Sequence, residues 1–283
     1  MPNNIVKGFI PEIFDASIYR TYEDNLIFKK ISKLTPSKGV QDAGDTVYFT
    51  DLADPSITDY TGTLTAENLK DSQIALLIDK EKTFCWTVKD EDQLMTNVDL
   101  KGSQADRSGY VLKRSVEVAE MQTVAGFAAA GTVTDATCDS ATIIGDLALL
   151  QQYLAEQNVS EEDMWMVIPP WVRVKLQLAG IAFQINNGIN GMGGMAWTNE
   201  LGFDMYVTNT VYNSGTAAAP VSSVLAGSYQ AIAYADKQLI TRTTPLTNTR
   251  AIQVDGGLVY GCKVVFPKYL AKAVLTFAAE TAI

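Results

Sequence analysis

The sequence predicts an α+β fold, in which a long hairpin and a long helix come first and shorter helices and strands follow. Three observations lead to this prediction. Residues 44–79 hold two strand-like runs on either side of a polar stretch, residues 103–130 form the longest helical candidate, and the C-terminal part returns to strand patterns. With 283 residues, of which 47% are hydrophobic, the chain can bury a substantial core.

An amphipathic arm is expected at residues 9–34. Pro11 suits the first turn of a helix. Apolar residues then recur at helical spacing: Ile13, Phe14, Ile18, Tyr22 and Leu26. The end of the arm is basic, with Lys29, Lys30, Lys33 and Lys38. An ordinary helix packed on its own domain explains the same pattern, so both interpretations stay open.

Residues 44–79 are interpreted as a long extended hairpin with a polar tip. Val47 and Phe49 lie on one face of its first strand, and residues 74–78 (IALLI) return to strand character. A lone two-stranded ribbon is marginally stable in water and has open edges. The hairpin must therefore rest on its own domain or on a neighbouring subunit.

The hairpin region is strongly acidic. Residues 42–71 contain one lysine, Lys70, against these acids: Asp42, Asp45, Asp51, Asp54, Asp59, Glu67 and Asp71. Such a run is usually a solvated face. It would also suit the negative half of an intersubunit contact.

A strand at residues 83–88 and helix-capping residues at 90–93 (DEDQ) lead into the long helix at 103–130, which is expected to end at Gly131. Its length, at 1.5 Å per residue, is roughly 40 Å. On a helical wheel one arc is charged: Lys113, Arg114, Glu117 and Glu120. The opposite side is covered by Val111, Leu112, Ser115, Val118, Ala119, Gln122 and Ala125.

The remaining elements form an α/β block followed by strands. Helices are expected at 141–157 and 171–180, and strands at 164–169, 203–209, 224–240, 250–255, 258–266 and 272–277. Residues 186–202 are rich in glycine and are interpreted as a loop.

Composition argues against most enzyme classes. The chain contains no histidine, which excludes Ser-His-Asp triads and histidine zinc ligands. Its net charge of −10 opposes recognition of free DNA or RNA. No run of about eighteen apolar residues exists, so no membrane contact is expected. The three cysteines, Cys85, Cys138 and Cys262, are interpreted as small buried thiols in a reducing compartment.

No catalytic, cofactor or metal site is predicted. The glycines at 188–194 lack the strand and helix start of a phosphate-binding loop. Helix capping explains the acids at 90–92, and Asp51, Asp54 and Asp59 lack the spacing of an EF-hand. A lysine on the hairpin, such as Lys70, could form an isopeptide bond to a neighbour's Asn, although a solvated lysine is the simpler interpretation.

Five stretches in this order resemble the major capsid (coat) proteins of tailed bacteriophages, whose fold is shared with encapsulin shells. They are FIPEIFDASIYRTYEDNLIFKKI, the run from GDTVYF to LLIDKEKTFCWTVKDEDQ, LALLQQYLAEQNVSEEDMWMVIPPWV, GMGGMAWTNELGFDMYVTNTV and DGGLVYGCKVVFPKYLAKAVL. One departure is the lack of an arginine near residues 163–165, where many relatives have one.

The resemblance implies the tailed-phage major capsid fold of the Hong Kong ninety-seven type. Residues 1–38 would be an N-terminal arm and 44–80 an extended loop. Residues 81–135 with 245–283 would form a peripheral domain carrying a long spine helix, and 136–244 an axial α/β domain. The intersubunit contacts expected on the arm and the loop involve Phe14, Tyr22, Asp54, Asp59, Tyr60 and Lys70.

The implied function is structural. The chain would assemble with itself into homo-pentamers and homo-hexamers of an icosahedral head around double-stranded DNA, with no cofactor. A portal protein and a separate scaffolding protein are expected partners, the latter because the arm motif begins near residue 9. The subunit would pass from the host cytoplasm to the virion. An encapsulin-like compartment is the alternative, while a carboxylate enzyme and a tail-tube or adaptor protein are further rivals.

Overall fold

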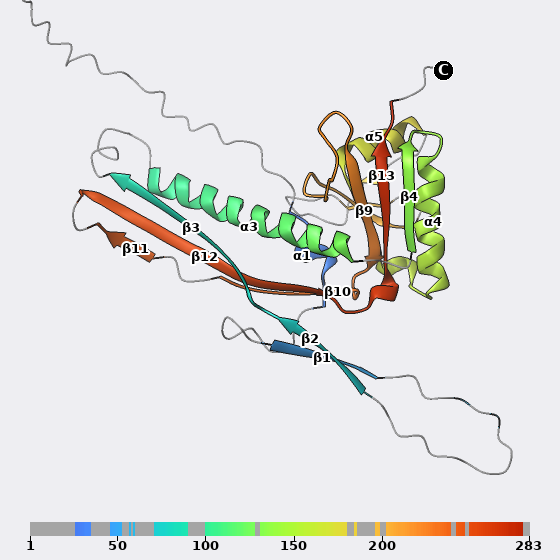
Figure 1. The fold of residues 1–283 in the computed structure, drawn as a ribbon, viewed down its shortest axis with the longest axis horizontal. Coiled ribbons are helices and arrows are strands. Elements are labelled where there is room, and N and C mark those ends of the chain that lie inside the picture. Colours follow the sequence, from blue (N-terminus) through green and yellow to red (C-terminus); the bar gives the residue numbers. More distant parts are fainter. Residues whose placement is uncertain are drawn as a thin grey trace, which may run out of the picture.

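The computed structural model describes residues 26–34, 46–52, 57, 59, 71–89, 100–127, 131–179, 184–185, 196–198, 202–238, 242–246 and 249–279. Figure 1 shows a compact body and a long, flat body joined end to end, with a two-stranded ribbon projecting below the joint. The two bodies are named here the compact body and the long body.

The compact body is built on a seven-stranded mixed sheet in the order β4-β13-β9-β5-β8-β7-β6. Its strands are β4 Gly131–Cys138, β5 Met164–Ile168, β6 Gln184–Ile185, β7 Ala196–Thr198, β8 Asp204–Val207, β9 Val221–Ser228 and β13 Leu270–Phe277. The β4–β13 and β5–β8 pairs are parallel. Helices α4 (Ile143–Glu156) and α5 (Pro170–Leu178) pack on this sheet.

Helix α4 shows why this body folds as it does. Ile143, Leu147, Leu150 and Leu154 repeat at intervals of three or four residues and are all fully buried. They meet alternate residues of β5, such as Met166, in one apolar cluster. A single-turn 3₁₀ helix, Glu161–Asp163, joins α4 to β5.

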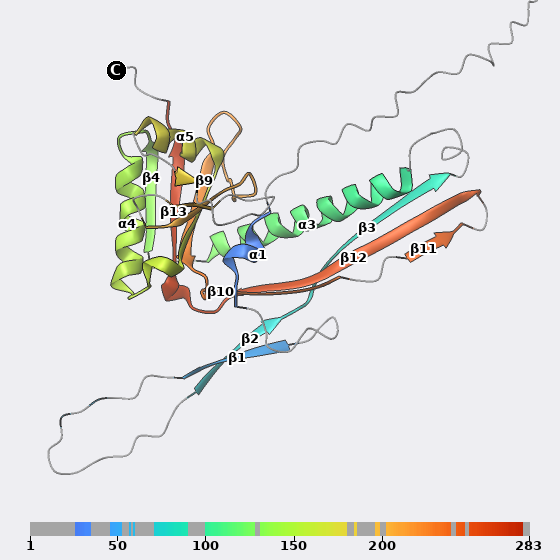
Figure 2. The same ribbon diagram turned by 180° about the vertical axis from the view of Figure 1, so that it is seen from behind.

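The long body pairs a four-stranded sheet with one long helix. Strand β12 (Ala251–Val264) is its centre and pairs antiparallel with β3 (Lys80–Lys89), β10 (Ile232–Gln238) and β11 (Arg242–Pro245). Helix α3 (Leu100–Gly126) runs along this sheet for most of its length, as both ribbon views show. Figure 2 also shows α1 (Phe28–Ile31) against the end of α3 nearest the compact body.

A shared apolar cluster holds the two bodies together. It combines Met121 and Val124 of α3 with Trp165 of β5, Leu225 of β9 and Ile232 of β10, all of them buried. The 3₁₀ turn Pro267–Tyr269 carries the chain from the long body back into the compact body as β13. The joint is therefore a packed core and not a bare linker.

The ribbon consists of β1 (Thr46–Leu52) and β2 (Asp71–Leu77), which pair antiparallel. This confirms the two strands expected at the base of the 44–79 hairpin. Among the described strands, β1 and β2 form a sheet of their own. Most of the polar tip lies outside the described residues.

The long helix differs from its prediction in two respects. It spans Leu100–Gly126 instead of 103–130, and Gly131 begins strand β4, which the sequence did not reveal. The charged arc is also divided, because Lys113 and Arg114 are exposed whereas Glu117 and Glu120 are buried, and Val111 and Val118 of the opposite side are exposed. The sheet of the long body and the α1 segment cover the side that bears these acids.

Two strand predictions were also wrong in their boundaries. The strands expected at 250–255 and 258–266 are one continuous strand, β12, which runs straight through Gly256 and Gly257. The segment expected at 224–240 is two strands, β9 and β10, separated by a turn at residues 229–231. Cys85 is exposed and Cys262 is partly exposed, so only Cys138 matches the expectation of buried thiols.

Candidate functional site

The ribbon has two chemically different faces. Val47 lies opposite Leu76 and Phe49 opposite Ile74, so these four apolar residues share one face, which turns toward the long body. The other face carries Thr46, Tyr48, Gln73 and Leu77, all exposed, and is named here the outer face of the ribbon. Tyr48 is 61% exposed and Leu77 49%. An exposed aromatic and an exposed leucine on a projecting ribbon are typical of a surface that another molecule covers.

The base of the ribbon is anchored firmly. Leu76 and Ile78 are buried against Val259 and Val265 of the long body. The ammonium of Lys263 on β12 donates a hydrogen bond of 2.7 Å to the backbone carbonyl of Ala75. The apolar contact and this hydrogen bond fix where the ribbon leaves the subunit, so its outer face is presented in a defined direction.

Gly261 is the position where the chain after the ribbon crosses β12. A Cβ at this position would overlap the carbonyl oxygen of Leu77 and would lie 3.1 Å from the Cα of Ile78. Both are backbone atoms, which cannot rotate away as the end of a side chain can. Glycine is thus required by the close approach of two backbones.

Replacing Gly261 by alanine is expected to destabilise the subunit by about 1–3 kcal/mol, because the crossing chain has to shift. Urea unfolding followed by circular dichroism measures the change. Gly145→Ala is the matched control: nothing lies within 4 Å of its added Cβ, and Gly145 is within helix α4. That control should be neutral or slightly stabilising. Equal midpoints for the Gly261 variant and the wild type would contradict the prediction.

Two carboxyl groups of α3 lie buried at the joint of the two bodies. Glu117 is 5% exposed, and its oxygens accept hydrogen bonds from the backbone N–H of Phe28 at 3.3 Å and from the hydroxyl of Thr210 at 2.7 Å. Glu120 is 2% exposed. Burial, and then the neighbouring carboxylates of Glu117 and Asp236, raise the pKa of Glu120 to about 9.

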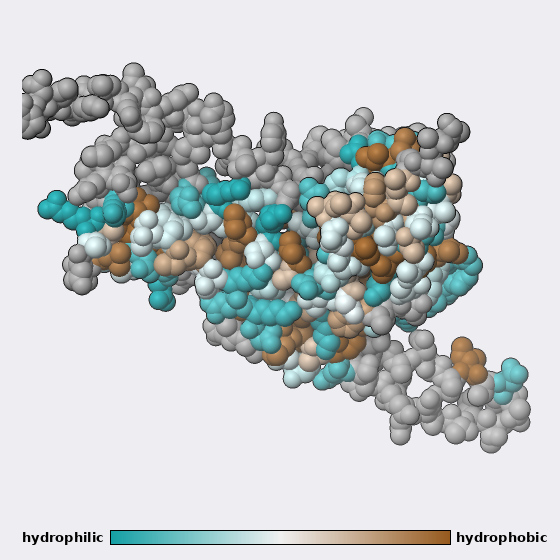
Figure 3. Space-filling view, turned by 45° about the horizontal axis from the view of Figure 1, so that its top comes forward, coloured by the Kyte–Doolittle hydropathy of each residue, from teal (hydrophilic) through white to brown (hydrophobic). Residues whose placement is uncertain are grey.

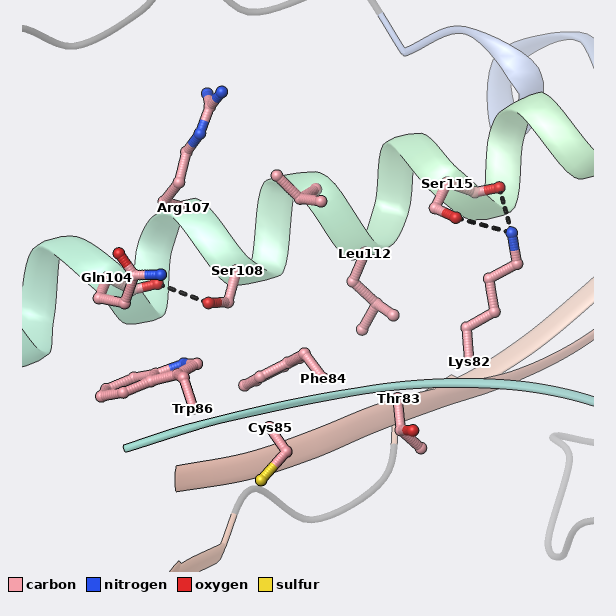
Figure 4. Close-up of a pocket in the computed structure, with 11 residues that line it drawn as sticks. Lys82, Thr83, Phe84, Cys85, Trp86, Gln104, Arg107, Ser108, Leu112 and Ser115 are labelled. Atoms are coloured by element: carbon pink, nitrogen blue, oxygen red, sulfur yellow. Dashed lines mark hydrogen bonds between the residues drawn. The ribbon is translucent and has the colours of Figure 1, made fainter. Parts of the chain in front are cut away.

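A groove of about 440 Å³ runs between β3 and α3. Figure 4 shows Phe84 and Trp86 of β3 pointing up toward the helix, with Leu112 pointing down toward the strand. At one end the ammonium of Lys82 donates hydrogen bonds to the carbonyl and hydroxyl of Ser115, at 2.6 and 2.7 Å. The groove is thus apolar in its middle and closed by a lysine at one end.

A third group of polar residues lies on the compact body, where no sequence pattern had singled it out. Asp135, Cys138 and Asp146 offer ligand atoms within 4.8 Å of one another. The hydroxyl of Thr142 donates a hydrogen bond of 3.0 Å to a carboxylate oxygen of Asp135. Burial, together with Asp135, raises the pKa of Asp146 to about 6. Sequence spacing alone could not have shown this group, because β4 itself was not predicted.

Most of the site residues predicted from the sequence lie outside the residues that the structure describes. Asp59 is described and is exposed. The other five, Phe14, Tyr22, Asp54, Tyr60 and Lys70, lie outside the described residues. Their role in subunit contacts stays a prediction. Sequence reasoning missed Tyr48 and Leu77, although strand alternation from Val47 and Phe49 would have placed Tyr48 on the opposite face.

No protein-family model matches the sequence, and no curated protein is significantly similar to it. Solved structures do match. A structure from Mycobacterium phage Che8 is 18% identical, with a TM-score of 0.71, and the match covers 96% of this chain and 97% of that one. The capsid of cyanophage P-SCSP1u gives 18% identity and a TM-score of 0.69, covering 96% and 94%.

The capsid of Ralstonia phage GP4 matches at 15% identity and a TM-score of 0.65, covering 100% of both chains. The likeness therefore extends over the whole chain, not over one domain. At these identities it defines the fold: the chain has the fold of phage capsid proteins. This confirms the fold resemblance noted in the sequence.

Proposed function

We propose that this chain is a major capsid protein that assembles with copies of itself into pentamers and hexamers of an icosahedral phage head enclosing double-stranded DNA. The observation that carries the proposal is the whole-length match to phage capsid structures. The ribbon supports it physically, because Tyr48 and Leu77 are exposed on the outer face of the projecting ribbon, where a neighbouring subunit could cover them.

A shell subunit has to fit rings of five and of six. We infer that the ribbon and the arm adjust between the two settings while the packed bodies keep their shape. The division proposed from the sequence assigns the arm to 1–38, the extended loop to 44–80, the peripheral domain to 81–135 and 245–283, and the axial domain to 136–244. In this proposal most of the long body belongs to the peripheral domain and most of the compact body to the axial domain. The exceptions are β10 and most of β11, which are in the long body, and β13 and most of β4, which are in the compact body.

Apolar side chains on both bodies are consistent with burial in an assembly. Figure 3 shows apolar areas, in brown, on the surfaces of the compact and the long body. Among the large apolar residues that are exposed are Val111, Val118, Leu149, Val174 and Leu178. Interfaces of permanent assemblies commonly bury about 2,000–5,000 Å² in total, so several such patches would be covered at once.

The proposal extends to partners and location. The net charge of −10 would keep packaged DNA from adhering to the wall. A scaffolding protein and a portal protein are proposed partners, and the subunit would move from the host cytoplasm into the virion. No described helix combines the length and apolar character needed to span a bilayer. The capsid structures matched above come from phages, which favours a phage head over an encapsulin-like compartment.

Electron microscopy of the purified chain, expressed alone and with a candidate scaffolding protein, tests the proposal. We expect rings or closed shells in at least one of the two preparations. The contents distinguish the alternatives, because a phage head would enclose nucleic acid and an encapsulin-like compartment would enclose an enzyme. A chain that stays monomeric with every scaffold candidate tried would contradict the proposal.

A further inference from the structure

The segment Ile27–Leu34, named here the arm segment, is seated in the joint between the two bodies. Ile27, Phe28 and Ile31 are almost completely buried in the apolar cluster of the joint. Its backbone is tied to the turn after β9 and to β10, through Lys33 N–H to the carbonyl of Tyr229 at 3.2 Å and a bridge between Leu34 and Ala233. The arm segment thus fills a gap that α3 and β10 leave between them.

Two polar contacts hold the arm segment to the acids below it. The backbone N–H of Phe28 donates to Glu117, and the ammonium of Lys29 lies 2.7 Å from a carboxylate oxygen of Asp236 on β10. Beside them is a cavity of about 160 Å³, lined among others by Phe28, Lys29, Glu117, Glu120 and Asp236. The cavity is roomy enough for water.

Glu120 is a group lining this cavity that has an unsatisfied carboxyl oxygen. Its side chain is 2% exposed, and the oxygen Oε1 is buried with no hydrogen-bond partner among the described residues. A charged carboxylate would leave that oxygen unsolvated, whereas a neutral carboxyl group costs much less to bury. The cavity floor beneath the arm segment is therefore compatible with the neutral form of Glu120.

Acidic and basic groups face Glu120 from every packed element: Glu117 and Lys113 on α3, Tyr234 and Asp236 on β10, Tyr260 and Cys262 on β12, Lys80 and Lys82 on β3, and Lys29 on α1. The two carboxylates oppose ionisation of Glu120, and Lys80 and Lys29 favour it less strongly. Lys29 is paired with Asp236, and Lys82 bonds Ser115. The surroundings as a whole favour the proton.

We propose that Glu120 is a proton-controlled lock on the arm segment, in which the neutral carboxyl keeps the segment seated and the ionised carboxylate loosens it. Ionisation would draw water into the cavity. This water would weaken the hydrogen bond from Phe28 to Glu117 and the ion pair between Lys29 and Asp236. Release would expose Ile27, Phe28 and Ile31, which the seated arm segment buries in the joint. The inference concerns the subunit itself and does not depend on the proposed capsid function.

The sign of the pH dependence follows from the pKa of Glu120. This pKa is about 9 when the segment is seated, against an ordinary value of 4.5 when Glu120 is exposed. The seated state holds a proton that the open state has lost between these two pH values. Seating is therefore favoured most below pH 4.5 and weakens as the pH rises toward 9.

Hydrogen–deuterium exchange of the full chain tests the lock. We compare the exchange rates of amides in residues 27–34 in the wild type with those in Glu120→Gln at each pH from 5 to 9. Taking the ratio removes the intrinsic effect of pH on exchange. We expect this ratio to rise with pH, by at most about tenfold per pH unit, the limit for one proton. A ratio that does not change with pH would overturn the proposal.

Two controls make the test specific. Glu162→Gln alters an exposed acid of the 3₁₀ turn and should keep the wild-type profile. Amides of β13 in the compact body, such as those of Ala271 and Ala273, should show no change in the ratio, because the effect is local to the joint. A pH-dependent rise in the β13 ratio equal to that in residues 27–34 would indicate global unfolding and would overturn the lock.

If Glu120→Gln does not fold, the wild type still gives an answer. The ¹³C chemical shift of the Glu120 side-chain carboxyl reports its titration directly, with the resonance assigned by selective labelling. A midpoint above pH 7 supports the lock, and a midpoint below pH 7 overturns it.

Discussion

Replacing Tyr48 and Leu77 together by aspartate is expected to prevent assembly while leaving the subunit folded. Both side chains are on the outer face of the ribbon and are largely exposed in the subunit, at 61% and 49%. Charges placed there stay in water, so the change in stability should be within about 0.5 kcal/mol. In an assembly that covers this face, the same charges would be buried without partners, at a cost of several kcal/mol per contact.

That cost recurs at every subunit contact of a shell, so even a modest penalty at one contact should abolish closed particles. Sedimentation velocity and electron microscopy measure assembly, and circular dichroism with urea unfolding measures the fold. The conservative pair Tyr48→Phe and Leu77→Met is the matched control and should still assemble. Shells formed by the aspartate variant in wild-type yield would show that this face is not an interface.

The second large effect is expected at Trp165, which lies in the apolar cluster of the joint. Trp165 is fully buried on β5, packs in the cluster shared by the two bodies, and belongs to the largest buried side chains. Trp165→Ala should lower the free energy of unfolding by about 3–5 kcal/mol, because it removes apolar contacts and leaves a cavity. Urea unfolding measures the loss.

Trp165→Phe separates packing from hydrogen bonding. The indole Nε1 of Trp165 is buried and has no hydrogen-bond partner among the described residues. Phenylalanine removes this unpaired donor while keeping most of the apolar volume, so its cost should be much smaller than that of alanine. Leu149→Ala, on the exposed face of α4, should have little effect. Equal losses for the alanine and phenylalanine variants would mean that volume does not dominate at this position.

The joint also shows what the charged arc of α3 could not reveal about burial. From the sequence, Glu117 and Glu120 look like the solvated side of an amphipathic helix. Their surroundings include Phe28, 89 residues before Glu117, Thr210, 93 residues after Glu117, and Asp236, which is farther still along the chain. A helical wheel contains no information about partners so distant in sequence.

Strand β12 illustrates the same limit for strands. Two strands were expected at 250–255 and 258–266, with Gly256 and Gly257 between them, and glycine weakens an isolated strand. In the structure β3 pairs along this stretch of β12, opposite Thr83 and Phe84, and the ladder continues through both glycines. Hydrogen-bonded pairing with the long strand β3 therefore outweighed the low strand propensity of the two glycines.

Periodicity alone determined the elements whose partners are close by or whose pattern is strong. The alternation of Val47 and Phe49 identified β1, and the repeat of Leu147, Leu150 and Leu154 identified α4, because one buried face requires that spacing whatever lies opposite. The order of the elements was enough to indicate the α+β class and the resemblance to capsid proteins. Tertiary structure alone decided which face of α3 is buried, that the chain after the ribbon crosses β12 at Gly261, and that Oε1 of Glu120 is buried without a hydrogen-bond partner among the described residues. Each of these depends on contacts between residues far apart in the chain, and such contacts leave no periodic trace in the sequence.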